Sequence, residues 1–273
     1  MADTANLFYD VFHNRRRLTG RLVALTPLRI GSGETSLDPG AVDNPVIRDA
    51  YGRPFIPGSS FKGVWRTFAE QVLGQLANGD RGCCDPLGAP CLSKEAVKNL
   101  KKEHEKDPRS LAEAIYAQLC PACRLFGSPH FAGRLRVRDL LLDERTWPGF
   151  CEVRPGVAID RDTRTVYRDR KYEIEAVPAG TAFTFEAIAE NVSEEEWRHI
   201  LLTLLPFTRG EVPLGGCTGC GLGRVRLEAV QVFSVTTANL RDFLACGWGG
   251  IVSQDVESAC REAGLILGGE ASV

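Results

Sequence analysis

The sequence predicts an α+β fold, on three observations. Residues 18–31 (LTGRLVALTPLRIG) and 181–190 (TAFTFEAIAE) alternate apolar and polar side chains, which is typical of half-buried strands. Two helical patterns, over 59–78 and 193–207, follow these two strands in the chain. When the intervening insertions are removed, the order is strand, helix, strand, strand, helix, strand. This β-α-β-β-α-β order is the ferredoxin-like unit that RRM domains share.

Composition limits the classes of function. The chain has 273 residues, 44% of them apolar, which suffices for one large domain with insertions or for two small ones. A net charge of −2 and a pI of about 6.1 argue against a surface coated in nucleic acid, so RNA binding would need a local basic groove. The acidic, polar start of the chain and the lack of an apolar run of roughly 18 residues predict a cytoplasmic protein with no membrane contact.

The first predicted strand, over 18–31, follows three arginines at 15–17. These arginines are either a solvated segment or a contact for RNA or another subunit. A turn at Gly33 ends the strand. The polar loop over 33–44 carries Asp43, and its composition alone indicates a turn or loop-capping residue.

The helix expected over 59–78 begins with an anion-binding pattern. The Ser59-Ser60 pair can cap the first turn by accepting backbone N–H bonds, and free N–H groups at a helix N-terminus attract anions. Lys62 and Arg66, one turn apart, could hold two neighbouring phosphates of a nucleic acid; the alternative is a capped surface helix with two solvated charges. The apolar stripe, which we assign to the core, comprises Phe61, Trp65, Phe68, Val72, Leu73 and Leu76.

Residues 79–134 form an inserted, cysteine-rich region. A Cys-x-x-Cys knuckle, Cys120 and Cys123, follows a charged segment and a predicted helix. Cys91 and either Cys83 or Cys84 can complete four sulfurs around a structural zinc ion, since adjacent cysteines rarely ligate one ion together. Ten cysteines in a reducing compartment favour metal binding over disulfides, and the alternative is a group of free thiols.

The remaining segments complete the pattern. A strand is expected over 135–142, and a hairpin over 150–176 has six basic and three acidic residues between 154 and 171, a local net charge of +3. A capping box over 193–196 begins the second helix. The Gly-rich loop, residues 214–223 (LGGCTGCGLG), lacks the Gly-Lys-Ser/Thr of a P-loop and opens no helix as a dinucleotide site would.

The run DNPVIRDAYGRPFIPGSSFKGVWR, from Asp43 to Arg66, resembles the signature of the CRISPR-associated RAMP proteins. The resemblance is closest to the backbone subunits of type III effector complexes, of the Csm-three and Cmr-four kind. These share Asp-x-Pro-Val-Ile-(Arg/Lys)-Asp, then Pro-x-Ile-Pro-Gly-Ser-Ser-x-Lys-Gly-x-x-Arg, and both halves stand here at the family's spacing. The similarity continues through the Gly-rich loop to about residue 235.

This resemblance implies a single RAMP domain over 1–273, with a ferredoxin-like palm, a zinc-binding fingers region over 79–134 and a thumb-like hairpin over 150–176. The thumb would insert across the guide–target duplex through Val157–Arg161. Cys217 and Cys220 replace a polar pair that relatives carry, and they are a candidate second metal half-site. The family favours Cys84 over Cys83, so the predicted zinc ligands are Cys84, Cys91, Cys120 and Cys123. The predicted RNA contacts are Arg48, Ser59, Ser60, Lys62, Arg66, Arg161, Gly215 and Gly216.

The function that the resemblance implies is binding of guide CRISPR RNA and cleavage of complementary target RNA, next to copies of itself or close relatives in the complex. Asp43 matches the aspartate that active relatives need, and magnesium or manganese is the ion expected to assist attack by a ribose 2′-OH. One alternative is a non-catalytic RNA-binding scaffold of the same complex. A second is a guide-processing endoribonuclease, which usually needs a placed histidine that the chain's motifs do not supply.

Overall fold

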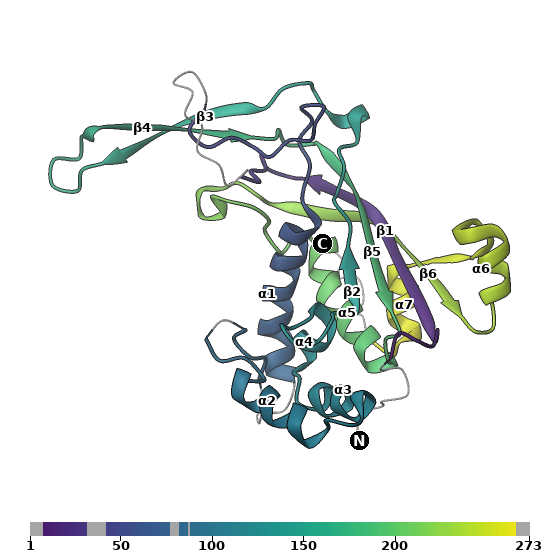
Figure 1. Ribbon diagram of the computed structural model, residues 1–273. Helices are drawn as coiled ribbons and strands as arrows, with labels where there is room; N and C mark the ends of the chain where they lie inside the picture. The colour runs from purple at the N-terminus through teal and green to yellow at the C-terminus, as the bar shows by residue number, and fades with distance from the viewer. Residues whose placement is uncertain (1–7, 32–41, 77–81, 87, 266–273) are drawn as a thin grey trace.

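A five-stranded antiparallel sheet organises the computed structural model, which describes residues 8–31, 42–76, 82–86 and 88–265 (Figure 1). The strand order is β2-β5-β1-β6-β7. The predicted mixture of helices and strands is confirmed, whereas the turn at Gly33 and most of the polar loop after it lie outside the described residues. The strands of this sheet are β1 (Asn14–Ala24), β2 (Leu135–Val137), β5 (Ala182–Glu190), β6 (Val225–Thr236) and β7 (Ser253–Asp255).

Helices cover one face of this sheet, and the cysteine-rich region lies at the far end of α1 (Figure 1). Within the described residues, no helix is long and apolar enough to cross a membrane. The helices are α1 (Gly58–Leu76), α2 (Lys94–Glu103), α3 (Pro108–Ala117), α4 (Pro121–Phe126), α5 (Glu194–Thr208), α6 (Leu240–Cys246) and α7 (Val256–Glu262). Three short 3-10 turns accompany them: η1 (Glu144–Thr146), η2 (Thr218–Cys220) and η3 (Gly247–Gly250).

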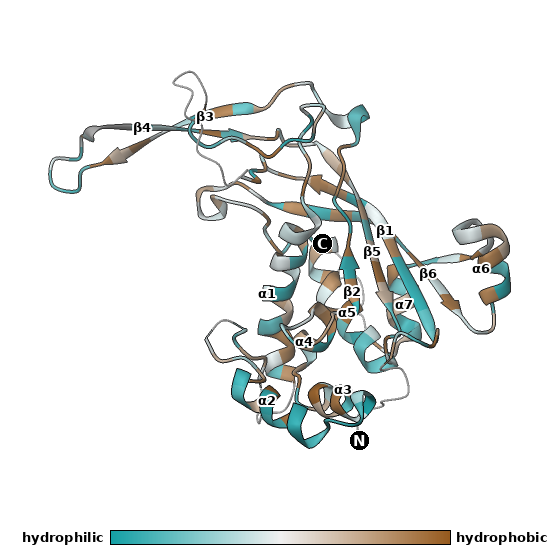
Figure 2. Cartoon of the chain, viewed as in Figure 1, coloured by the Kyte–Doolittle hydropathy of each residue, from teal (hydrophilic) through white to brown (hydrophobic). Residues whose placement is uncertain are grey.

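The strand β1 begins at residue 14 rather than 18, so it includes the three arginines, and its start is hydrophilic in Figure 2. Arg15 and Arg17 lie on one face of the sheet and pair with Glu190 at 2.6 Å and Glu186 at 2.9 Å. Arg16 lies on the other face, where α5 packs. The alternative of a solvated segment is therefore wrong, because carboxylates more than 160 residues away neutralise these charges. The alternative of a contact with RNA or another subunit stays a prediction.

Aromatic side chains form the centre of the core between α1, α5 and the sheet. The Phe61 ring lies 5.2 Å from that of Phe185 in β5 and 5.1 Å from that of Phe207 in α5, measured between centroids. Buried Trp65 satisfies its indole by donating to the Thr203 hydroxyl at 2.9 Å. The predicted core face of α1 is confirmed at these positions. The assignment of Leu76 to the core is wrong, since its side chain at the helix end is 56% exposed.

Two other local predictions have opposite outcomes. The capping box that begins α5 is confirmed: the Ser193 hydroxyl accepts from the Glu196 N–H, and the Glu196 carboxylate accepts from the Ser193 N–H. The strand expected over 135–142 is shorter, because β2 ends at residue 137. The chain beyond it makes only isolated bridges, between Leu140 and Ile56 and between Leu142 and Phe183.

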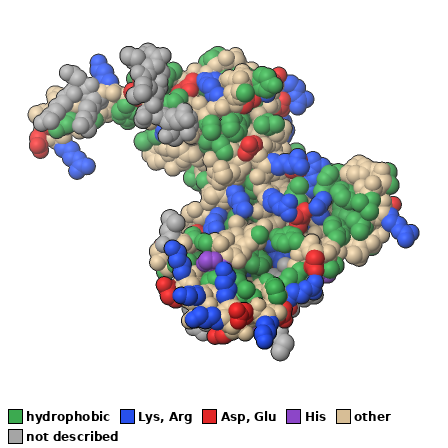
Figure 3. All heavy atoms as spheres, in the orientation of Figure 1, with side chains coloured by type: hydrophobic (Ala, Val, Ile, Leu, Met, Phe, Trp, Pro, Cys, Tyr) green, Lys and Arg blue, Asp and Glu red, His purple; other side chains and the backbone are tan. Residues whose placement is uncertain are grey.

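A separate two-stranded hairpin, β3 (Glu152–Ile159) and β4 (Val166–Ala176), projects from the body of the molecule (Figure 1). Basic side chains stand out at its far end in Figure 3, where residues 161 and 164 are exposed arginines. Apolar side chains are also exposed along it, although a soluble hairpin would normally cover them. These are Val153, Val157, Ile159, Val166 and Tyr172.

Candidate functional site

The exposed carboxylate of Asp43 lies beside the root of the hairpin. Its Oδ2 accepts a hydrogen bond from the backbone N–H of Glu173 in β4 at 2.9 Å. The next residue, Asn44, bridges to Ile174, and its Nδ2 donates to the Glu173 carbonyl at 3.2 Å. These bonds fix Asp43 against β4. Among the described residues no cation pairs with it.

Residues 27–31, just after β1, hold three parts of the chain together. They pair with the end of β4, with the loop that follows Asp43 and with the Gly-rich loop. The site is therefore assembled from segments almost 200 residues apart in the sequence. The backbone bonds are Leu28 with Val177, Ile47 to Ile30, Gly216 to Arg29 and Gly223 to Pro27, all at 2.7–2.9 Å.

Arg29 is a residue that the sequence analysis missed. Its Nη2 donates to the Oδ1 of Asn44 at 3.0 Å, and its Nη1 lies 3.9 Å from the sulfur of Cys217 in the Gly-rich loop. The only sequence signal was a charged residue between the buried Leu28 and Ile30. That signal is weak, because charged residues commonly alternate with apolar ones along a strand.

The Gly-rich loop packs directly on the backbone of Arg29. Gly215 has φ of +87°, and a Cβ there would lie 2.2 Å from the Arg29 carbonyl oxygen. A Cβ on Gly216 would lie 3.0 Å from Nη1 of the same residue. Gly215 thus needs glycine for reasons of packing and conformation, whereas a side chain at position 216 would press on the Arg29 guanidinium. Their contact with RNA stays a prediction.

The first turn of α1 is capped differently from the prediction. The helix begins at Gly58, whose N–H donates to Oδ1 of Asp139 at 2.7 Å. In the described part of the chain no backbone N–H donates to the side-chain hydroxyl of Ser59 or Ser60, so the capping role predicted for these serines is wrong. An internal carboxylate takes the first N–H instead. The two serines line an open groove of about 700 Å³ with the segment 211–213.

Lys62 and Arg66 have different surroundings although they are one turn apart. Arg66 donates to Glu70 at 2.7 Å and to the carbonyl of Gly127 at 2.9 Å, so it ties α1 to the end of α4. Lys62 has no carboxylate partner among the described residues. Burial, together with the charges of Arg66 and Arg136, lowers the pKa of Lys62. An anion at this position would relieve that repulsion.

The other predicted RNA contacts are two arginines, one at the root of the hairpin and one at its tip. Arg48 is engaged within the protein, because it pairs with Glu175 of β4 and donates to the carbonyl of Gly52 at 2.9 Å. Arg161 is exposed in the turn at the hairpin tip. In that turn the Asp160 carboxylate accepts from the Thr163 N–H at 2.8 Å. The structure therefore separates these two arginines along the length of the hairpin.

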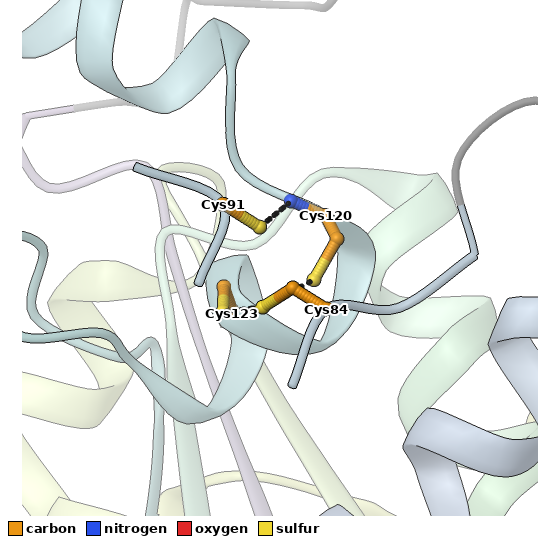
Figure 4. Close-up of side chains that lie close together, drawn as sticks. All are labelled: Cys84, Cys91, Cys120 and Cys123. Carbon is orange, nitrogen blue, oxygen red and sulfur yellow. Dashed lines mark hydrogen bonds between the residues drawn. The ribbon is translucent and has the colours of Figure 1, made fainter. Parts of the chain in front are cut away.

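Four of the predicted cysteines meet at one point, where α4 begins (Figure 4). All four sulfurs lie within 4.8 Å of one another. The sulfur of Cys84 lies 3.4 Å from that of Cys123 and 3.9 Å from that of Cys120, and Cys91 accepts from the Cys120 N–H at 3.2 Å. Cys84 rather than Cys83 belongs to the group, which is arranged to bind a metal ion such as zinc.

The thiols of this group differ in acidity. Burial raises the pKa of Cys91 to about 12. Hydrogen bonds from Cys123 and Cys83 lower the pKa of Cys120. A metal ion that binds here has to displace the remaining protons, because the thiolate is the ligand form. By contrast, Cys217 and Cys220 belong to no group of three or more potential metal ligands in the described residues.

Comparison with known protein families identifies the chain. Residues 21–226 match the model of the RAMP superfamily, which is most of the chain and includes Arg29, Asp43 and the Gly-rich loop. The chain belongs to the RAMP superfamily. The part that matches contains the end of β1, then α1, the cysteine-rich region, the hairpin and α5, so every candidate site described above lies within it.

Curated RAMP relatives cover most of the chain at low identity. The chain is 26% identical over 226 residues to the CRISPR system Cms endoribonuclease Csm3 of Methanocaldococcus jannaschii, which covers 79% of each protein. It is also 26% identical to the proteins of that name from Methanothermobacter thermautotrophicus, over 81% of this chain and 86% of the relative, and from Enterococcus italicus, over 80% and 93%.

Proposed function

We propose that this protein is a backbone subunit of a type III CRISPR effector complex. In this proposal it binds guide RNA and cuts complementary target RNA, with Asp43 as the catalytic residue. The observation that carries the proposal is the place of Asp43, an exposed carboxylate of the family motif that is fixed against the root of the hairpin. The endoribonuclease names of the Csm3 relatives support the reaction type. The partners are guide RNA, target RNA and other subunits, and the free cysteines suit a cytoplasmic protein.

The strand order supports a ferredoxin-like palm. The palm elements are β1, α1, β2, β5, α5 and β6, and their strands lie in the order second, third, first, fourth. The cysteine-rich region then corresponds to fingers, inserted between α1 and β2, and the β3–β4 hairpin to a thumb, inserted between β2 and β5. Exposed Val157 and Ile159 give the thumb apolar side chains that can pack against an unstacked base.

The carboxylate of Asp43 would act on the nucleophile of the reaction. With Oδ2 held by the Glu173 N–H, the other oxygen can orient a ribose 2′-OH for in-line attack on the adjacent phosphate, or accept its proton. A magnesium or manganese ion would supply charge neutralisation at the phosphate. No group of three or more acidic, histidine or cysteine side chains in the described residues includes Asp43, so such an ion would take its other ligands from RNA and water.

Guide binding would rest on basic and small groups that extend from α1 and the Gly-rich loop to the tip of the hairpin. Lys62, which lacks a carboxylate partner within the described residues, is the strongest of them. Ser59 and Ser60 in the adjoining groove, Gly215 and Gly216 in the Gly-rich loop, and the arginines Arg48, Arg66 and Arg161 are the others. Phosphate contacts of this kind position the RNA without reading its bases, which suits a subunit that accepts any guide.

The four-cysteine group fits a structural zinc ion. A tetrahedral site with Zn–S bonds of about 2.3 Å places its sulfurs about 3.8 Å apart, close to the 3.4 and 3.9 Å separations found here. Cys84, Cys91, Cys120 and Cys123 would hold the ion and join the loop at 84–91 to the start of α4. Four thiolates leave no open position for a substrate, so zinc would stabilise the region and take no part in RNA cleavage.

The test of the proposed reaction is replacement of Asp43 in the assembled complex. Asp43→Ala and Asp43→Asn should each reduce cutting of a labelled target RNA about a hundredfold or more. Asp43→Asn is the matched control for structure, because an amide oxygen can still accept from the Glu173 N–H while the charge is gone. Binding of target should stay within about twofold.

Two outcomes would contradict the cleavage proposal. Wild-type rates in both variants would remove Asp43 as the catalytic group. A wild-type complex that binds target but does not cut it with magnesium, manganese or any other divalent ion would establish the alternative, a non-catalytic RNA-binding scaffold.

A further inference from the structure

The guanidinium of Arg29 spans the space between two functional loops. One arm, Nη2, donates to the Asn44 side chain at 3.0 Å, directly beside Asp43. The other arm, Nη1, meets the Cys217 sulfur at 3.9 Å in the Gly-rich loop. Among the described residues this is the one side chain found bonded to both loops. The inference drawn from it rests on the proposed function of Asp43.

The contact with Asn44 has a defined orientation. Arginine only donates, and the Glu173 carbonyl only accepts, so the amide of Asn44 must present its oxygen to Arg29 and its nitrogen to Glu173. The side chain of Asn44 is thus held from both sides at once. The backbone of Arg29 is fixed as well, because its carbonyl accepts from the Gly216 N–H at 2.9 Å.

We propose that Arg29 is a positioning residue for RNA cleavage, which holds Asn44 and so places the Asp43 carboxylate relative to the Gly-rich loop. The bonds to β4 fix Asp43 and Asn44 along the hairpin root, and the Arg29 bond fixes Asn44 from the opposite side. The Gly-rich loop, which we expect to contact the RNA backbone, and the loop that bears the carboxylate are thereby held at a fixed distance from each other.

The forked shape of arginine matters for this role. A guanidinium presents donors in a planar fork and can reach Asn44 and Cys217 together, whereas the ammonium group of a lysine is a single point on a flexible stem. A lysine at position 29 can retain one of these contacts and loses the other. Loss of position by about 1 Å at a reacting group can reduce a rate about a hundredfold, without any loss of binding.

The experiment compares Arg29→Ala, Arg29→Lys and wild type in the assembled complex, with the complex in excess over target RNA, at a concentration that saturates binding, and a divalent ion present. The single-turnover rate constant of cutting should fall about tenfold to a hundredfold in Arg29→Ala, and less in Arg29→Lys. The dissociation constant of target RNA should change less than about twofold. The double variant Arg29→Ala/Asn44→Ala should cut at the rate of Asn44→Ala alone, because residues that act through one another are not additive.

Arg224→Ala is the matched charge control. Arg224 directly follows the Gly-rich loop, its side chain is exposed, and the described residues offer that side chain no ion pair or hydrogen bond. Its removal subtracts the same charge beside the same loop and should leave the cutting rate within about twofold. An equal loss of rate in Arg224→Ala and Arg29→Ala would show an effect of charge alone and overturn the positioning role.

Hydrogen exchange of the purified full-length chain provides a readout that needs no activity. Peptides covering residues 42–48 should exchange several-fold faster in Arg29→Ala, and peptides from α5 should not change. Unchanged exchange over 42–48 overturns the inference. If wild type cuts normally and Arg29→Ala cuts equally well, the positioning role alone fails. If wild type does not cut, the proposed function fails with it.

Discussion

Replacement of Arg66 and of Lys62, one at a time, should separate stability from RNA binding on α1. Arg66 is largely buried, and its contacts with Glu70 and Gly127 join the helix to the end of α4. Lys62 has no carboxylate partner in the described structure and lies near two like charges. Arg66→Ala should therefore destabilise the protein, whereas Lys62→Ala should weaken guide RNA binding and leave stability almost unchanged.

The magnitude for Arg66 follows from its two bonds. A hydrogen bond between a charged donor and a partly buried carbonyl contributes about 1.5 kcal/mol, and a partly exposed helical ion pair about 0.5 kcal/mol. The free energy of unfolding should fall by about 2 kcal/mol in Arg66→Ala. With 273 residues the unfolding entropy is about 0.6 kcal/mol per kelvin, so the melting temperature should fall by about 3–4 °C.

For Lys62→Ala the change in unfolding free energy should stay within about 0.5 kcal/mol. The slope of log affinity for guide RNA against log salt should fall by about 0.7, the value for one phosphate contact with a single strand. The measurements are thermal unfolding of the purified chain and guide binding at several salt concentrations. Lys102→Ala, on α2, is the matched charge control and should change neither. A melting temperature in Arg66→Ala equal to wild type, or an unchanged salt slope in Lys62→Ala, would refute the reasoning.

Two further predictions concern the metal group and pH. Elemental analysis should find about one zinc per chain in wild type and in Cys83→Ser, and close to none in Cys123→Ser, because Cys123 belongs to the four-sulfur group and Cys83 does not. Wild type without zinc would remove the site. Burial lowers the pKa of His199 from its ordinary 6.5, so the unfolded chain takes up a proton below pH 6.5 before the folded one does. Stability should therefore be lost as the pH falls below 6.5, and the fall in urea midpoint between pH 6.5 and 5.5 should be smaller in His199→Gln; equal slopes would contradict this assignment.

Features set by neighbouring residues in the chain could be predicted from the sequence. The stripe of α1 placed Phe61 and Trp65 in the core, and the Ser193–Glu196 box placed the start of α5, because both patterns operate within one or two helical turns. The cysteine group was also foreseeable, since Cys-x-x-Cys fixes two sulfurs on one turn and leaves few candidates for the others.

Features that depend on distant partners could not be predicted in this way. Arg15 and Arg17 look solvated in the sequence until β5 brings carboxylates beside them. Arg16 in the same way meets Glu194 of α5. The cap of α1 comes from Asp139, far along the chain. The local sequence offers Ser59 and Ser60 at a suitable place, and so it predicts the wrong cap. Arg29 carries no motif at all, because its role exists only where the Gly-rich loop and Asn44 meet.

The contacts between the start of α1 and the segment after β2 have a consequence for the cysteine-rich region, which lies between them in the chain. The Gly58–Asp139 bond and the Ile56–Leu140 bridge bring together the two ends of an excursion that contains α1 and the whole cysteine-rich region. The entropy of closing such an excursion grows only with the logarithm of its length, so doubling it costs about 0.6 kcal/mol. Length added around α2, whose buried Val97 belongs to a separate apolar cluster, should therefore have little effect on the stability of the sheet. The helix α4 has to stay, because its Leu125 and Phe126 pack in the main core.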